Sequence, residues 1–174
     1  MTPLAADAQS GELIVWRLER EKHFASWHTG EGAFLAGGRW NTKGRRVVYA
    51  SSDPSTAILE VAVHKHFETL ARVPHLLLKI LIKDGRDFPK IDRAMMPVGW
   101  CEPGASTDDE KRFGDSELSQ SPAIAVPSAV SSHSWNVLLN ASGYPALFEL
   151  ISSEPFELDH RLLNMDLKSP NTRL

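Results

Sequence analysis

Short runs of apolar, β-branched and aromatic residues recur along the chain, and they predict a series of β-strands. The first two runs are Leu13–Leu18 and Arg46–Ala50. The run His75–Ile82 is dense in Leu and Ile, which favours a strand buried on both faces. Shorter candidates of the same kind follow near the C-terminus, at Ala123–Val126, Val137–Leu139, Ala146–Ile151 and Pro155–Leu158.

One segment has a clear helical pattern. Asp53 is a typical N-cap residue, and Pro54 suits the first helical position because its missing N–H would be unpaired there. At about 100° per residue, Glu60 falls outside the apolar stripe and on the side of His64 and Phe67, so we expect it to face a cleft or solvent. The stripe itself consists of Ala57, Ile58, Val61 and Ala62.

The remaining pattern suggests one domain. Residues 1–12 are small and polar, and predict a flexible N-terminal tail before a domain that spans 13–174. The segment Gly99–Gln120 is polar, acidic and interrupted by glycine, which indicates an irregular or partly helical insertion. Strands mixed with few helices predict an α+β fold: a single compact domain with a mixed β-sheet and flanking helices.

Composition excludes several classes of protein. The net charge of −3 argues against a basic surface that binds nucleic acid directly. Cys101 is the single cysteine, so neither an internal disulfide nor a thiolate zinc site is expected, and no His-Glu-x-x-His metal motif occurs. No secretory signal and no apolar run of bilayer length is present, from which we expect a cytoplasmic location and no membrane contact.

The densest cluster of unusual residues is Gly37-Gly38-Arg39-Trp40-Asn41, followed by Gly44. An arginine held in such a loop suits a pyrophosphate, because its planar fork donates paired hydrogen bonds. Tyr49 ends a predicted strand, and Glu60 follows it by eleven positions. Each window by itself is equally typical of a surface turn, a packing tyrosine or a solvated helix charge. Ser128 lies outside any Gly-x-Ser-x-Gly elbow, which disfavours a hydrolase nucleophile.

In order along the chain, these windows resemble the RES family, which is named for Arg, Glu and Ser residues. The resemblance extends from Val15 to Leu163 and is carried by Trp16-Arg17-Leu18, Gly37-Gly38-Arg39-Trp40-Asn41, Val48-Tyr49-Ala50, Ala57-Ile58-Leu59-Glu60, Val126-Pro127-Ser128-Ala129, Asn136-Val137-Leu138-Leu139-Asn140 and Asp159-His160-Arg161-Leu162. This chain departs from the family pattern after Asn140, where Asn-Pro-x-His is common, and before Asn136, where an acidic residue is common.

The resemblance implies a fold similar to that of ADP-ribosyltransferase toxins, and a toxin of a bacterial toxin–antitoxin pair. Such toxins cleave NAD at the nicotinamide–ribose bond and pass ADP-ribose to a protein, water or phosphate. NAD is then a consumed substrate and no resident cofactor is implied, in keeping with the absence of a Gly-x-Gly-x-x-Gly fingerprint. The implied partner is a helix-turn-helix antitoxin of the Xre type, through which DNA is contacted only indirectly, and a host protein is a candidate acceptor.

The resemblance also assigns residues. Glu60, Arg39, Tyr49 and Ser128 take catalytic positions, and Arg17, Arg39, Tyr49 and Ser128 take NAD-binding positions, with no metal. Two other classes stay open at this point. One is a ribonuclease-type toxin that uses His64 or His75 with Arg39, which the acidic balance disfavours. The other is a catalytically silent module that only binds its antitoxin.

Overall fold

Six strands form the centre of the computed structural model, which describes residues 12–83, 88–104, 106–143 and 145–163. Almost all of the expected N-terminal tail, and the last eleven positions of the expected domain, lie outside these residues. The strands are β1 (Leu13–Arg20), β2 (Val47–Ser51), β3 (His75–Ile82), β4 (Ala123–Pro127), β5 (Trp135–Asn140) and β6 (Phe148–Phe156). The α-helices are α1 (Glu31–Ala36), α2 (Pro54–Lys65), α3 (Phe67–Arg72) and α4 (Asp108–Gln120). Short 3-10 turns occur at η1 (Glu21–Ser26), η2 (Arg93–Met95), η3 (Pro145–Leu147) and η4 (His160–Leu162).

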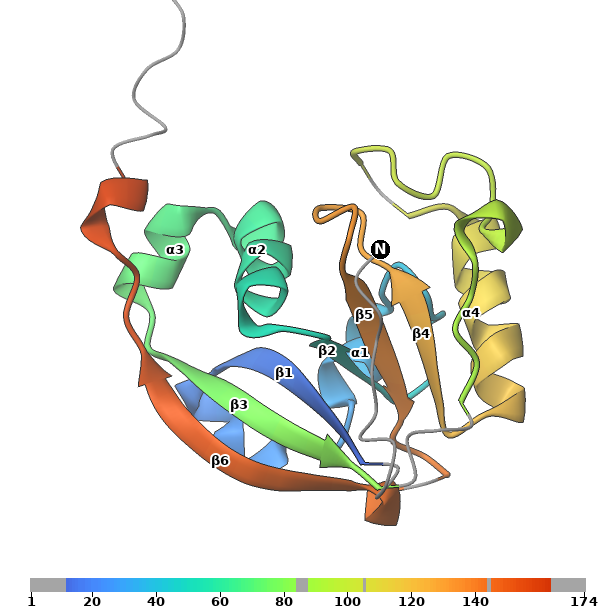
Figure 1. The fold of residues 1–174 in the computed structure, drawn as a ribbon, viewed down its shortest axis with the longest axis horizontal. Coiled ribbons are helices and arrows are strands. Elements are labelled where there is room, and N and C mark those ends of the chain that lie inside the picture. The colour runs from blue at the N-terminus through green and yellow to red at the C-terminus, as the bar shows by residue number, and fades with distance from the viewer. Residues whose placement is uncertain (1–11, 84–87, 105, 144, 164–174) are drawn as a thin grey trace, which may run out of the picture.

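The sheet has the order β4-β5-β2-β1-β3-β6 and consists of two halves that meet weakly (Figure 1). Every residue of β1 has a partner on β3, whereas β1 and β2 share the single register pair Trp16–Ser51. The halves therefore splay apart at this junction. The α+β class is confirmed. Where we expected a mixed sheet, all five strand pairs are antiparallel, and the parallel contribution among the described residues is the isolated bridge Lys90–Ala125.

Alternation along the strands builds three apolar cores. Val48 and Ala50 of β2 face a core enclosed between the two half-sheets, and Val47 and Tyr49 face the opposite side. On that opposite side, the half-sheet β2-β5-β4 packs against α4 through Leu118. The other half-sheet packs its outer face against α2 and α3. Since both faces of most strands are covered, the strand sequences are almost continuously apolar.

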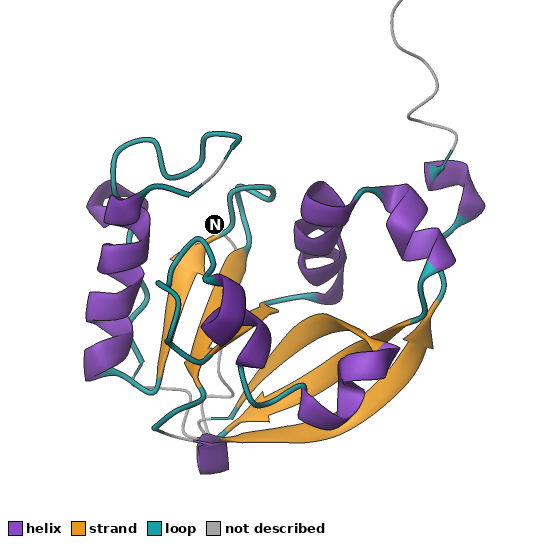
Figure 2. Ribbon diagram, turned by 180° about the vertical axis from the view of Figure 1, so that it is seen from behind, coloured by secondary structure: helices purple, strands orange, loops and turns teal. Residues whose placement is uncertain are grey.

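The predicted helix start is confirmed in detail. α2 begins at Pro54, and the Asp53 carboxylate accepts a hydrogen bond of 2.8 Å from the amide of Thr56. Two helices of six residues, α1 and α3, were not predicted, since so short a segment carries little periodicity. Figure 2 shows α1 in front of the sheet, on the side turned away from the viewer in Figure 1. No helix in the described part of the chain has the length and apolar character needed to span a membrane.

The segment Gly99–Gln120, expected to be irregular or partly helical, is partly helical. Its second half is the regular 13-residue helix α4, capped by the side chain of Thr107. Leu118 of this helix is fully buried, and Gly114 lies so close to the Trp40 backbone that no side chain fits between them. The length and regularity of this helix were not predicted, because its inward positions are Glu110, Gly114 and Leu118, of which only Leu118 has a large apolar side chain. α4 is in fact a packed support of the sheet.

Candidate active site

A cleft of about 960 Å³ opens above β1 and β2, between α2 on one side and α1 with the loop after it on the other. Its volume is at the upper end of the range usual for small-molecule sites. Four of the residues singled out from the sequence line it together: Arg17, Arg39, Tyr49 and Glu60. The fold thus brings side chains from two strands, a loop and a helix to one place.

Glu60 lies in the last half of α2 and points into the cleft, as its position outside the apolar stripe predicts. Its Oε1 accepts a hydrogen bond of 2.8 Å from Ser128 Oγ and a second, short one from Asn136 Nδ2. Within the described residues, Oε2 has no protein partner. One carboxylate oxygen is therefore held by the protein while the other is available to a ligand.

Ser128 lies behind Glu60 and not in the cleft itself. It follows β4 directly, its side chain is fully buried, and it is absent from the cleft lining. The hydroxyl donates to Glu60 and accepts from the backbone amides of Val130 (3.2 Å) and Ser131 (3.0 Å). A hydroxyl has one donor and two acceptor sites, and all three are used. In the structure the Ser128 hydroxyl therefore holds Glu60 and has no hydrogen-bonding site left for a ligand.

Arg17 bridges the weak junction of the sheet. Its Nη1 donates a 2.7 Å hydrogen bond to the backbone carbonyl of Tyr49 on β2, where the ladder between β1 and β2 has opened. On the same strand, Glu19 accepts from Nε (2.9 Å) and pairs with Nη2 (2.5 Å). Both partners hold the guanidinium at the floor of the cleft, where about a quarter of its side chain stays exposed.

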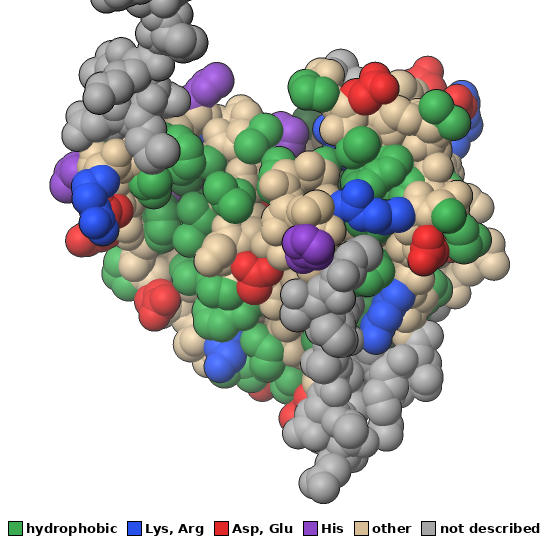
Figure 3. Space-filling view, turned by 45° about the horizontal axis from the view of Figure 1, so that its top comes forward, with side chains coloured by type: hydrophobic (Ala, Val, Ile, Leu, Met, Phe, Trp, Pro, Cys, Tyr) green, Lys and Arg blue, Asp and Glu red, His purple; other side chains and the backbone are tan. Residues whose placement is uncertain are grey.

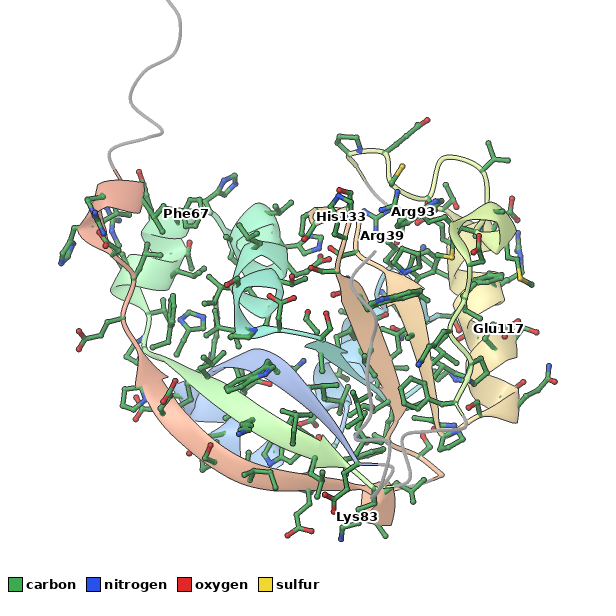
Figure 4. All side chains as sticks on the ribbon, viewed as in Figure 1. Arg39, Phe67, Lys83, Arg93, Glu117 and His133 are labelled. Carbon is green, nitrogen blue, oxygen red and sulfur yellow. The ribbon has the colours of Figure 1, made fainter. Side chains whose placement is uncertain are left out.

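Arg39 is held by the Trp100 carbonyl and by Glu110 of α4. Its Nη1 donates to the Trp100 carbonyl at 2.7 Å and lies 3.4 Å from Glu110 Oε2 of α4. The Glu110 side chain is only 2% exposed, so the ion pair is shielded from solvent on one side. Figure 4 shows Arg39 near Arg93, whose guanidinium stacks over the Trp100 ring at 5.3 Å. No local pattern pointed to Glu110, since it lies in the segment expected to be irregular or partly helical.

Tyr49 and Asn41 organise the glycine-rich loop. The Tyr49 hydroxyl donates to Asn41 Oδ1 at 2.6 Å and accepts from the Trp40 amide at 3.2 Å. Burial raises the pKa of this hydroxyl well above its usual value, so it is a neutral donor. Asn41 is fully buried and donates to the carbonyls of Ala33 and Thr42. The loop is thus tied to α1 and β2, and the Tyr49 ring forms part of the cleft wall.

Asn136 is a cleft residue that contacts Glu60 and was not predicted from the sequence as a site residue. It belongs to a quoted motif but was given no function, because an asparagine at a strand start is usually a turn or edge residue. In the structure it lies at the start of β5, lines the cleft and contacts Glu60. Only the pairing of β5 with β2 brings it there.

The histidines are divided between the cleft and the core. His64 and His23 line the cleft, but His75 is buried on β3 with Nδ1 2.6 Å from the Val73 carbonyl, and it does not line the cleft. Burial lowers the pKa of His75. Of the two histidines named for a ribonuclease, His64 thus shares the cleft with Arg39 and His75 does not. No group of three or more His, Cys, Asp or Glu residues able to hold a metal occurs within the described ranges.

The chain is similar to known proteins over most of its length. The family model described as the RES domain matches residues 14–160. A protein named Toxin Res from Photorhabdus laumondii is 35% identical over 155 residues, which are 87% of this chain and 97% of that protein. A protein named Prs ADP-ribosylating toxin from a Sphingobium strain is 28% identical over 130 residues, covering 72% of this chain and 80% of that protein.

The fold is also similar to a solved structure. It superposes on a chain of the M. tuberculosis MbcT–MbcA toxin–antitoxin complex with a TM-score of 0.69 and 18% sequence identity, over 90% of this chain and 88% of that chain. At this identity the likeness concerns the fold alone.

Proposed function

This chain belongs to the RES domain family, and on that premise we propose that it is the toxin of a toxin–antitoxin pair that cleaves NAD between nicotinamide and ribose. ADP-ribose then passes to an acceptor, which is a target protein, water or phosphate. NAD is consumed as the substrate. The proposed place of action is the cytoplasm, where the substrate and the antitoxin are both present.

The observation that carries the proposal is the state of Glu60. Its Oε1 is held by Ser128 and Asn136, its Oε2 has no protein partner among the described residues, and the residue lines a cleft of about 960 Å³. Cleavage of a glycosidic-type bond passes through a transition state with oxocarbenium-like positive charge at the ribose. A fixed carboxylate oxygen beside that centre stabilises the developing charge without having to reorient. The nicotinamide ring leaves as a neutral molecule, so the bond breaks without a general acid.

The two arginines suit the remainder of the substrate. Arg17 and Arg39 each use part of the guanidinium for protein contacts and keep part of it exposed, at 24% and 20% of the side chain. The remaining N–H groups are available to the pyrophosphate, and the fixed orientation favours bidentate binding. Tyr49 offers an aromatic wall on which the cationic nicotinamide ring can stack, a contact worth roughly 0.5–2 kcal/mol. The relative named Prs ADP-ribosylating toxin supports this class of chemistry.

An enzyme that consumes NAD needs an inhibitor, and we propose a helix-turn-helix antitoxin of the Xre type for this role. The similar solved fold comes from a toxin–antitoxin complex, which supports a protein partner. Exposed apolar side chains include Leu59 and Val63 on α2 and Met95 and Val98 in the segment 95–98, and Figure 3 shows hydrophobic side chains exposed on one face of the molecule. Such side chains are typical of surfaces that bind proteins. With a net charge of −3, DNA contact is left to the antitoxin.

The deciding experiment is NAD consumption by the purified protein, freed of antitoxin and followed by mass spectrometry. It is run with and without phosphate, and with and without cell lysate, so that the fate of ADP-ribose identifies the acceptor. Glu60→Gln keeps an oxygen that accepts from Ser128 and Asn136, and therefore keeps the fold and the binding of NAD. We expect its turnover to fall by at least about 10²-fold.

The matched control is Glu68→Gln, the same change at an exposed position of α3 outside the cleft. It is expected to retain full turnover. NAD that stays intact under all conditions, or a Glu60→Gln protein as active as the parent, would refute the proposal.

A further inference from the structure

The two oxygens of the Glu60 carboxylate have different surroundings, and Ser128 is one of two residues that cause the difference. Oε1 receives two donors, one from the end of β4 and one from the start of β5. A glutamate side chain ends in a torsion with broad, roughly two-fold preferences, so its carboxylate rotates easily unless it is held. Two donors that converge on one oxygen from different strands fix both the position and the plane of the group.

Asn136 is itself fixed by a third residue. Its Oδ1 accepts a hydrogen bond of 2.8 Å from Ser51 Oγ, and Ser51 is only 3% exposed. The two residues are direct register partners in the β2–β5 pair. A flipped Asn136 amide would place its oxygen against the Glu60 carboxylate, two acceptors facing each other. The contact with Glu60 therefore determines the orientation of the amide, and Ser51 stabilises that orientation.

We propose that Asn136, anchored by Ser51, is a positioning residue that commits Oε1 of Glu60 to the protein and presents Oε2 to the substrate. This inference rests on the proposed function, because it assigns the means by which the reactive carboxylate is oriented. Asn136 acts through Glu60, and Ser51 acts through Asn136. A misplacement of about 1 Å in a reacting group costs on the order of 10² in rate, which makes such a relay consequential.

The test compares two variants of Asn136 in the full-length protein. Asn136→Asp keeps the size of the side chain and an oxygen that accepts from Ser51, but replaces the donor to Glu60 by an acceptor. Asn136→Ala removes the donor without adding charge. Both are expected to lower kcat by about 10²-fold while KM for NAD changes less than about threefold, since the arginines that bind the pyrophosphate are untouched. A change confined to KM in both variants would overturn the proposal.

Two variants of Ser51 test whether it anchors Asn136. Ser51→Ala leaves the Asn136 amide without its anchor, and a lost hydrogen bond of this type predicts a fall in kcat of about 2- to 10-fold. Ser51→Thr retains the hydroxyl on a residue that suits a strand, and is expected to restore kcat to near the parent value. Equal kcat in Ser51→Ala and the parent would refute the role of the anchor.

A matched control lies four positions along the same strand. Asn140 is buried and its amide donates to the Leu118 carbonyl at 2.9 Å, with no connection to Glu60. Asn140→Asp removes a donor from β5 in the same way as Asn136→Asp, and is expected to lower the urea midpoint while kcat is retained. If Asn140→Asp lowered kcat as much as Asn136→Asp, a general weakening of β5 would explain both and the proposal would fail.

A readout independent of turnover separates this inference from the proposed function. In NMR spectra, the side-chain amide proton of Asn136 that faces Glu60 is expected far downfield, and to move upfield in Glu60→Gln because the acceptor loses its charge. An inactive parent protein that shows this shift would refute the NAD chemistry but retain the hydrogen bond. An active parent without the shift would refute the positioning role alone.

Discussion

Gly38 lies where the glycine-rich loop packs against the Tyr49 ring, and it gives the sharpest test of the described geometry. A Cβ added to this glycine would lie 2.8 Å from Asn41 Oδ1 and 2.9 Å from Tyr49 Cζ, and closer still to the Tyr49 hydroxyl oxygen. Ordinary contacts begin near 3.4 Å, so the phenol ring must move by at least about 0.5 Å. The substitution Gly38→Ala is therefore an overpacking change at a site without free space.

The size of the effect follows from the contacts that would be disturbed. Overpacking of a closely packed site costs about 1–3 kcal/mol. The moved hydroxyl also loses its bonds to Asn41 Oδ1 (2.6 Å) and to the Trp40 amide (3.2 Å), each worth about 0.5–1.5 kcal/mol. We expect Gly38→Ala to lower the free energy of unfolding by about 2–6 kcal/mol, a large part of the 5–15 kcal/mol typical of a domain. Since the Tyr49 ring lines the cleft, the affinity for NAD is expected to fall as well.

Urea denaturation followed by tryptophan fluorescence measures this change, with calorimetry for NAD binding. The control is Gly32→Ala, where the added Cβ meets nothing within 4 Å and the residue lies in α1. Alanine is favoured over glycine in a helix by about 1 kcal/mol, so this variant is expected to be at least as stable as the parent. A Gly38→Ala protein within about 0.5 kcal/mol of the parent would show that the loop does not approach Tyr49 as described.

Two further predictions concern stability. Asp53→Ala removes the N-cap of α2. Burial raises the pKa of the Asp53 carboxyl, but the hydrogen bonds from the Thr56 hydroxyl and amide outweigh it and hold that pKa below its usual value. We expect the free energy of unfolding to fall by about 1 kcal/mol in urea denaturation, and an unchanged midpoint would contradict the cap. Burial lowers the pKa of His75 although its contact with the Val73 carbonyl opposes the shift, so the unfolded chain takes up a proton below about pH 6.5 while the folded protein resists it. Stability is then full above that pH and declines as the pH falls toward the folded-state pKa. His75→Asn should remove this component of the pH dependence, whereas the same change at the exposed His133 should not.

The sequence was informative wherever one local rule dominated. β3 occupies His75–Ile82 as its dense apolar run predicts, and α2 begins at Pro54 after the predicted Asp53 cap. The outward direction of Glu60 followed from helical geometry alone, because the angle between residues of one helix does not depend on the rest of the fold. The order of the motifs was sufficient to identify the family.

The tertiary structure decided what these residues contact. Ser128 and Asn136 reach Glu60 from β4 and β5, at sequence separations of 68 and 76 residues. Such contacts depend on strand register and on the splay of two half-sheets, and neither is encoded in a local pattern. Glu110 escaped notice for a related reason: it stabilises Arg39 from a helix whose composition is polar, across 71 residues of chain. Spacing within one element is fixed by backbone geometry and can be read from the sequence, whereas the pairing of distant polar groups is fixed by the sum of all packing in the domain.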